Sequence, residues 1–216
     1  MAIIGLKPPR VANSTILCVG AHCDDIEIGC GGTIMRLAAE LPAAKFVWAI
    51  FAGEAERDVE SRAAARALLP DGREPELRFH HFRASYFPAQ YGELKDAFEA
   101  LKDTQPDVIF THHLHDRHQD HAVLAELTWN TFRSHQIFEY EIAKFEGDLG
   151  QPNCFFPLAE QTLEKKIAVL MKHFPSQQSR SWFTADTFRA LARIRGVECN
   201  APEKFAEAFH VRKFCL

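Results

Sequence analysis

The stretch T-I-L-C-V-G, residues 15–20, runs directly into A-H-C-D-D-I-E-I-G-C-G-G-T, residues 21–33. The first part is a short hydrophobic run, which predicts a buried strand. It ends in His22, followed closely by Asp24 and Asp25. Adjacent carboxylates at the end of a buried strand are unfavourable unless a cation neutralises them. A metal ion would do so, and the stretch therefore predicts a metal-dependent site at the end of the first strand.

Strands and helices alternate along the first two-thirds of the chain. Hydrophobic runs predict strands at 15–21, 45–51, 77–82 and 107–111, and helical patterns predict helices at 33–41, 54–69, 92–102 and 122–132. This alternation predicts βαβ units, and hence a Rossmann-like α/β fold with a mostly parallel sheet and flanking helices. Beyond a loop expected at 146–160, helices are expected at 162–173 and 185–195. We therefore predict a single domain, residues 1–216, with a C-terminal extension.

A second polar cluster follows the strand predicted at 107–111. Its members are His112, His113, His115, Asp116, His118, Asp120 and His121. Open parallel sheets bind ligands at the carboxyl ends of their strands, so we expect both clusters at one edge of the sheet. Catalytic zinc takes three ligands from His and Asp or Glu and keeps a position for water. His22 with one of the two aspartates supplies two ligands, and D-R-H-Q-D-H, residues 116–121, supplies a third.

Composition and charge exclude several classes of partner. The 216 residues include 25 basic and 29 acidic side chains, for a net charge of −4. No basic surface for nucleic acid and no polybasic patch for a membrane is expected. No apolar stretch approaches the roughly 20 residues of a membrane span, and residues 1–10 lack the features of a signal peptide. The six cysteines form no C-x-x-C pair and are expected to be reduced thiols in a cytoplasmic protein. The oligomeric state is left open, a homo-oligomer included.

The motif A-H-C-D-D, residues 21–25, resembles the A-H-P-D-D motif of the LmbE-like (PIG-L) N-deacetylases. These are zinc-dependent enzymes that remove acetyl groups from N-acetylglucosamine-type substrates. The similarity continues through D-x-H-x-D-H (116–121), Y-E-I-A-K-F-E-G-D (140–148), H-F-P-S-Q (173–177), R-G (195–196) and A-E-A-F (206–209). It covers nearly the whole chain. It implies Zn²⁺ as cofactor, with Fe²⁺ acceptable to the same ligands, and a small N-acetylated sugar or glycoconjugate as substrate.

The resemblance also implies roles for individual residues. Three side chains correspond to zinc ligands: His22, Asp25 and His121. Asp24 corresponds to the general base that takes a proton from water. His118 corresponds to the histidine that stabilises the transition state, expected in its protonated form, and Asp120 to the carboxylate that orients it. Arg57, in R-D-V-E, resembles a substrate-binding arginine. The predicted reaction is hydrolysis of an N-acetyl amide to acetate and a free amine.

Three short segments and Cys23 complete the comparison with the family. G-C-G-G-T, residues 29–33, is expected to form a tight strand-to-helix turn, because glycine permits such a conformation. Residues 176–177 and 206–209 close the site if the resemblance holds, whereas their spacing alone predicts a loop and a helix end. Cys23 replaces the proline that is usual in the family, which would place a thiol beside the metal.

Other functions fit parts of the pattern. Two histidines and one carboxylate also form the iron site of non-haem oxygenases, but those enzymes are commonly built on all-β barrels. D-R-H-Q-D-H is similar to the metallo-β-lactamase motif H-x-H-x-D-H, but Asp116 replaces its first histidine. A different metal-dependent hydrolase, or a non-catalytic α/β module that binds a sugar or nucleotide, remains an alternative.

Overall fold

The computed structural model describes residues 14–213, in which seven strands form one sheet. The strands are β1 (Thr15–Gly20), β2 (Lys45–Ile50), β3 (Glu76–Phe79), β4 (Val108–His112), β5 (Gln136–Tyr140), β6 (Cys154–Leu158) and β7 (Phe205–His210). Their order in the sheet is β3-β2-β1-β4-β5-β7-β6. The first five are parallel, whereas β7 runs antiparallel to both β5 and β6. The predicted mostly parallel α/β sheet is confirmed.

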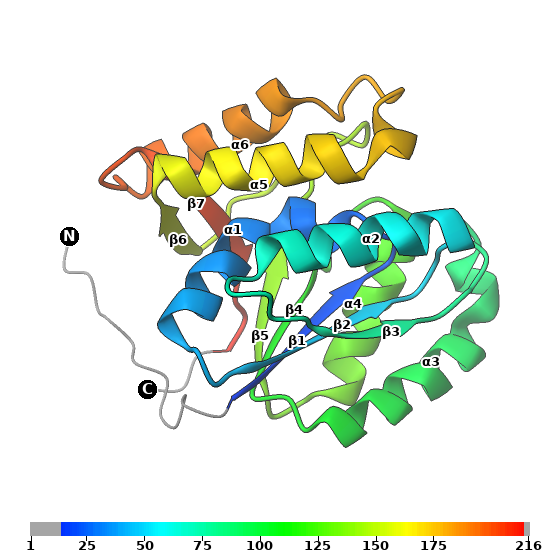
Figure 1. Ribbon diagram of the computed structural model, residues 1–216. Helices are drawn as coiled ribbons and strands as arrows, with labels where there is room; N and C mark the ends of the chain where they lie inside the picture. The colour runs from blue at the N-terminus through cyan, green and yellow to red at the C-terminus, as the bar shows by residue number, and fades with distance from the viewer. Residues whose placement is uncertain (1–13, 214–216) are drawn as a thin grey trace.

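Helices cover both faces of this sheet. They are α1 (Asp25–Glu40), α2 (Ala55–Leu68), α3 (Tyr91–Ala100), α4 (Gln119–Thr131), α5 (Glu160–His173) and α6 (Ala185–Glu198). Figure 1 shows α1 and α2 on one face and α3 and α4 on the opposite face. Helix α5 packs against α1 and α2 from outside, and α6 packs on β7 and β6. The central strands are buried on both sides, which explains why they read as continuous hydrophobic runs. In β1, Ile16 and Cys18 belong to the core under α1, and Leu17 and Val19 to the core under α3 and α4.

Three strands near the C-terminus were not expected from the sequence. β5 lies where the hydrophobic pattern weakens, after Ile137, and β6 lies inside the predicted loop 146–160. β6 contains Pro157, which is tolerated because β6 is an edge strand. The expected helix end at 206–209 is wrong, since these residues form part of β7. β7 pairs with β5 on one side and β6 on the other, so tertiary pairing overrides the weak strand preference of Ala and Glu.

The glycine-rich stretch does not form the predicted turn. Helix α1 begins at Asp25 rather than Thr33, so the glycines lie inside it, and the helix is kinked at Cys30, where φ is −142°. The glycines instead permit close packing. A Cβ on Gly29 would come within 2.2 Å of the Tyr140 ring, and one on Gly32 within 2.6 Å of the Leu158 side chain. The helix therefore starts within the A-H-C-D-D motif itself.

No helix within residues 14–213 is both long and apolar enough to cross a lipid bilayer. Residues 1–10, on which the signal-peptide prediction rests, lie outside the described residues, as does Cys215. The five cysteines inside that range, Cys18, Cys23, Cys30, Cys154 and Cys199, are free thiols.

Replacing Gly29 tests the close packing of α1. We expect Gly29→Ala to lower the free energy of unfolding by about 2 kcal/mol, because the new methyl group overlaps the buried Tyr140 ring. Gly92→Ala in α3 is the matched control: its Cβ would meet nothing described within 4 Å, so it should stabilise by up to about 1 kcal/mol. Urea unfolding of both variants measures the difference. Equal effects would contradict the packing role of Gly29.

Candidate metal centre

The two polar clusters meet at the carboxyl ends of β1 and β4. These strands are adjacent and parallel, so the segments that follow them leave the sheet at the same edge. His22 and Asp24 lie in the short connection after β1, and Asp25 is the first residue of α1. His118 is the N-cap of α4, which places His121 in the first turn of that helix. The predicted meeting of residues about 100 positions apart is thus observed.

Three side-chain atoms form a compact set at this edge. His22 Nδ1 lies 3.3 Å from Asp25 Oδ2 and 3.2 Å from His121 Nε2, and the remaining distance, His121 Nε2 to Asp25 Oδ2, is 3.5 Å. A tetrahedral ion bound at about 2.0–2.1 Å has ligand atoms about 3.4 Å apart. The three atoms therefore have the mutual spacing of three corners of a metal-ligand tetrahedron.

Each histidine of this set has a carboxylate on its second ring nitrogen. His22 Nε2 lies 3.3 Å from Asp120 Oδ2, and His121 Nδ1 lies 2.9 Å from Asp116 Oδ2. Carboxylate–histidine–metal arrangements of this kind fix the tautomer and the orientation of the ring. Lys144 donates to the same Asp116 oxygen at 2.9 Å. Asp116 and Lys144 are contributors that sequence reasoning did not assign, although both stand in motifs shared with the family.

Asp120 contacts a different histidine from the one expected. The sequence-based prediction paired its carboxylate with His118, but the carboxylate lies against His22 and accepts hydrogen bonds from the backbone N–H groups of Ser85 and Phe87. Only the backbone N–H of Asp120 reaches His118, donating to Nδ1 at 3.3 Å. Asp120 therefore links the loop that carries Ser85 to His22.

Two further histidines, His112 and His118, lie close to the candidate ligands His22, Asp25 and His121, called the ligand set below. Two other groups of three side chains also have their ligand atoms within 4.8 Å of one another: His22–His118–His121 and Asp25–His112–His121. His112 Nε2 accepts the backbone N–H of Ala21 at 2.9 Å, so its lone pair is already used. His118 accepts a backbone N–H on Nδ1, and a neutral ring then carries its proton on Nε2, which makes that atom a donor. We therefore favour Asp25 over either histidine as the third ligand.

The two adjacent aspartates have opposite electrostatic environments. Burial alone raises the pKa of Asp25, but His121, His112 and His22 hold it well below its usual value. For Asp24, burial dominates and raises the pKa, and the ion pair with Arg57 only partly offsets this. Arg57 Nη2 lies 2.7 Å from Asp24 Oδ1. The lowered pKa keeps Asp25 ionised, whereas the raised pKa makes Asp24 easier to protonate.

The histidines also titrate differently from one another. Burial lowers the pKa of His22, but Asp25 and Asp120 outweigh it and raise the pKa to about 10. Burial and the neighbouring His112 lower the pKa of His121 to about 3. Burial and the charge on His22 lower the pKa of His118 as well. These contacts favour a neutral His118 imidazole with its proton on Nε2 over the protonated form expected from the sequence.

Cys23 points away from the ligand set. Its Sγ donates to the carbonyl oxygen of Ala52 at 3.5 Å and lies 3.9 Å from Asp58 Oδ1. Burial raises the pKa of this thiol strongly, which keeps it protonated. The expected thiol beside the metal is not found, because consecutive residues leaving the strand point in different directions.

The segment 176–177 contacts helix α2 rather than the ligand set. Ser176 donates from its backbone N–H and from its hydroxyl to Glu60, at 3.0 and 2.6 Å. Ser176 and Gln177 form a short 3₁₀ turn, η4 (Pro175–Gln177), after α5. The turn therefore connects the C-terminal extension to the helix that carries Arg57.

Comparison with known proteins places this architecture. Residues 17–132, more than half of the chain, match the family described as PIG-L, GlcNAc-PI de-N-acetylase. The uncharacterized deacetylase YaiS of Escherichia coli K12 is 31% identical over 176 residues, which cover 73% of this chain and 89% of YaiS.

Two solved structures share the fold at low sequence identity. The N,N'-diacetylchitobiose deacetylase from Pyrococcus horikoshii has a TM-score of 0.69 at 20% identity, with 92% of this chain and 84% of that chain covered. GalB, the 4-carboxy-2-hydroxymuconate hydratase from Pseudomonas putida KT2440, has a TM-score of 0.72 at 17% identity, with 94% and 98% covered. One of these proteins is a deacetylase and the other a hydratase, so the fold alone does not select the reaction.

The metal content of variants distinguishes the residues that bind the ion from those that only lie near it. We expect His121→Ala to lose the bound divalent metal, because His121 supplies one corner of the tetrahedron. His118→Ala should retain the metal, because its Nε2 carries a proton. Elemental analysis of both purified variants beside wild type measures the ratio of metal to protein. Metal lost from His118→Ala and retained in His121→Ala would reverse the assignment.

Proposed function

This chain belongs to the PIG-L family, and we propose that it is a metal-dependent N-deacetylase that hydrolyses the N-acetyl group of an N-acetylglucosamine-type sugar or glycoconjugate. The products are acetate and a free amine. The observation that carries the proposal is the divergence of Asp24 and Asp25. One carboxylate completes a three-atom tetrahedral set with His22 and His121, and the other faces Arg57 with a raised pKa.

The donor set suits a divalent cation. His and carboxylate ligands accept both Zn²⁺ and Fe²⁺, and we propose Zn²⁺ with Fe²⁺ as the alternative. Bound at such a site, the ion supplies polarisation of a carbonyl group and lowers the pKa of water from about 15.7 toward 7. The ligands on the chain are His22, Asp25 and His121, held by the carboxylates of Asp120 and Asp116.

Two residues beside the ligand set, Asp24 and His118, have separate roles in the reaction. Asp24 is the general base: it takes the proton of the attacking water and returns it to the leaving amine. Its raised pKa brings it nearer to the value at which a base both accepts and releases a proton. His118 donates its Nε2–H to the oxyanion of the tetrahedral intermediate, a contribution of about 3 kcal/mol by analogy with oxyanion holes.

Arg57 orients the base and binds the substrate. Its ion pair fixes the Asp24 carboxylate, and within the described residues its buried Nε has no hydrogen-bond partner. That atom is shielded from solvent, but 22% of the Arg57 side chain is exposed, which leaves the rest of the guanidinium group open to a ligand. We propose a hydroxyl or carbonyl oxygen of the sugar as its acceptor. This interpretation retains the predicted substrate-binding role of Arg57 and adds the positioning of Asp24.

The substrate class rests on relatives. The family name refers to GlcNAc-PI, and a structural neighbour is named for N,N'-diacetylchitobiose. Both names describe N-acetylated amino sugars, and we propose the same class for this chain. We also propose that residues 1–216 act as one catalytic domain, since every strand from β1 to β7 belongs to one sheet. An oxygenase function receives no support from a helix-flanked parallel sheet.

Asp24→Asn tests the division of work between the aspartates. We expect the variant to retain its metal while acetate release falls by about 10²–10⁴-fold, because an amide side chain does not accept the proton of water. Asp25→Asn is the matched control, expected to lose the metal as well as activity. Acetate release is measured over a panel of N-acetylglucosamine derivatives, with metal content in parallel. An active Asp24→Asn would refute the base assignment, and its loss of metal would make Asp24 a ligand.

A further inference from the structure

Helix α1 is interrupted directly behind the ligand set. The non-helical Cys30 divides it into residues 25–29, which begin with Asp25, and residues 31–40. A kink of this kind leaves carbonyl groups without partners at the end of the first segment and N–H groups without partners at the start of the second. Cys30 Sγ donates to the carbonyl of Ile26 at 3.3 Å, within the last turn of the first segment.

Two charged side chains from the C-terminal extension satisfy other groups at the kink. Glu207, on β7, accepts the N–H of Gly32 at 2.8 Å and that of Thr33 at 2.6 Å, one on each carboxylate oxygen. Lys166, on α5, donates to the carbonyl of Ile28 at 2.6 Å. Each charge has the sign that the adjoining helix end favours, since N-termini stabilise anions and C-termini stabilise cations.

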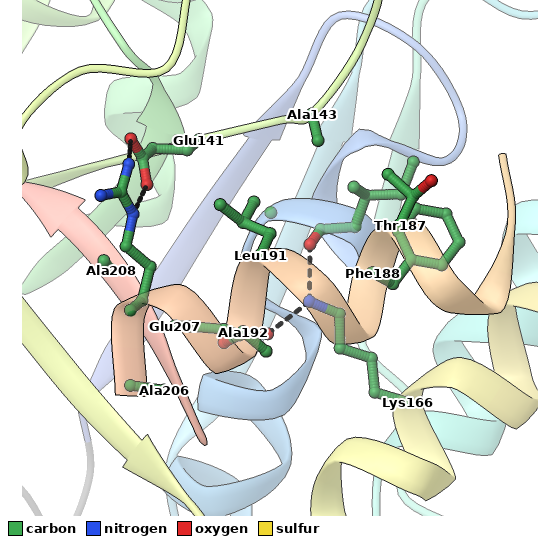
Figure 2. Close-up of a pocket in the computed structure, with 13 residues that line it drawn as sticks. Glu141, Ala143, Lys166, Thr187, Phe188, Leu191, Ala192, Ala206, Glu207 and Ala208 are labelled. Carbon is green, nitrogen blue, oxygen red and sulfur yellow. Dashed lines mark hydrogen bonds and ion pairs between the residues drawn. The ribbon is translucent and has the colours of Figure 1, made fainter. Parts of the chain in front are cut away.

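The same two side chains form an ion pair. Lys166 Nζ lies 2.6 Å from Glu207 Oε1, and both residues are only 5% exposed. Figure 2 shows the dashed contact between Lys166 and Glu207. A buried ion pair gains little stability by itself, because desolvation of the two charges opposes their attraction. A specific geometric role accounts for its presence better than stability does.

We propose that Lys166 and Glu207 are positioning residues that set the direction of residues 25–29, and through it the placement of the Asp24 and Asp25 carboxylates. The five-residue segment is too short to hold a helical direction alone. Its N-terminal end is held by contacts around Asp25, and its C-terminal end by Lys166. The C-terminal extension thus affects the metal centre through its contacts with the backbone of α1, and not through contacts with the ligands themselves. The inference rests on the metal role proposed above.

Metal affinity tests this role with a readout independent of turnover. Full-length protein, stripped with a chelator, is titrated with Co²⁺, whose visible absorption reports both binding and coordination geometry. We expect Lys166→Met to raise the Co²⁺ dissociation constant by about tenfold, as removal of supporting groups does at other metal sites. Lys166→Arg should restore most of the affinity, because the cavity of about 30 Å³ beside the pair leaves room for a guanidinium group.

A matched control separates positioning from general stability. Leu170 lies on the same helix as Lys166 and is fully buried. Leu170→Ala should lower the Tm as Lys166→Met does, but leave the Co²⁺ dissociation constant and spectrum unchanged. Should Lys166→Met fail to fold, Glu207→Gln carries the test, since it keeps the shape of the side chain and removes the charge.

The outcomes distinguish this inference from the proposed function. Wild-type protein that binds no Co²⁺ would contradict the metal role and the inference together. Wild-type protein that binds Co²⁺, with unchanged affinity and spectrum in Lys166→Met or Glu207→Gln, would contradict the inference alone. Weakened binding in these variants, with normal binding in Leu170→Ala, supports it.

Discussion

Neutralisation of two adjacent buried carboxylates is the constraint on which the rest of this structure depends. Asp24 and Asp25 are each only 4% exposed, and two such charges side by side are strongly unfavourable without cationic partners. Different elements supply those partners. His22, which follows β1, is the cationic partner of Asp25, and Arg57, from α2, is that of Asp24. His121, from α4, lies 3.5 Å from Asp25 as a neutral ring. Each partner also gives its aspartate a different protonation behaviour, which is what hydrolysis of an amide requires.

The parallel topology makes this convergence possible. β1 lies between β2 and β4, so the strand-to-helix connections that follow these three neighbouring strands open at one edge. The supporting carboxylates come from the same edge: Asp116 precedes α4, and Asp120 lies in its first turn. The antiparallel strands β7 and β6, at the other end of the sheet, contribute no candidate ligand but support helix α1. β7 carries Glu207 to the back of α1, where it meets Lys166 from α5.

The site was more predictable from the sequence than the C-terminal third of the fold. The two polar clusters follow two strong hydrophobic runs, so pattern and topology were enough to predict that the clusters meet. The choice of His22, Asp25 and His121 within them came from the resemblance to the LmbE-like family. The turn predicted at the glycines of α1 was wrong, because their small size allows close packing against Tyr140 inside a helix. β7 was missed because its strand character depends on pairing with β5 and β6. The contact of Glu207 with Gly32 spans 175 residues, and no local pattern encodes it.

The most direct test of the central claim is acetate release before and after removal of the metal. Wild-type protein is assayed as purified, after chelation, and after addition of one equivalent of Zn²⁺ or Fe²⁺, on an N-acetylglucosamine derivative. We predict that chelation abolishes acetate release and that one of the two ions restores it. Release at an unchanged rate from the chelated protein would show that the His22–Asp25–His121 set has no part in the reaction, and would contradict the account.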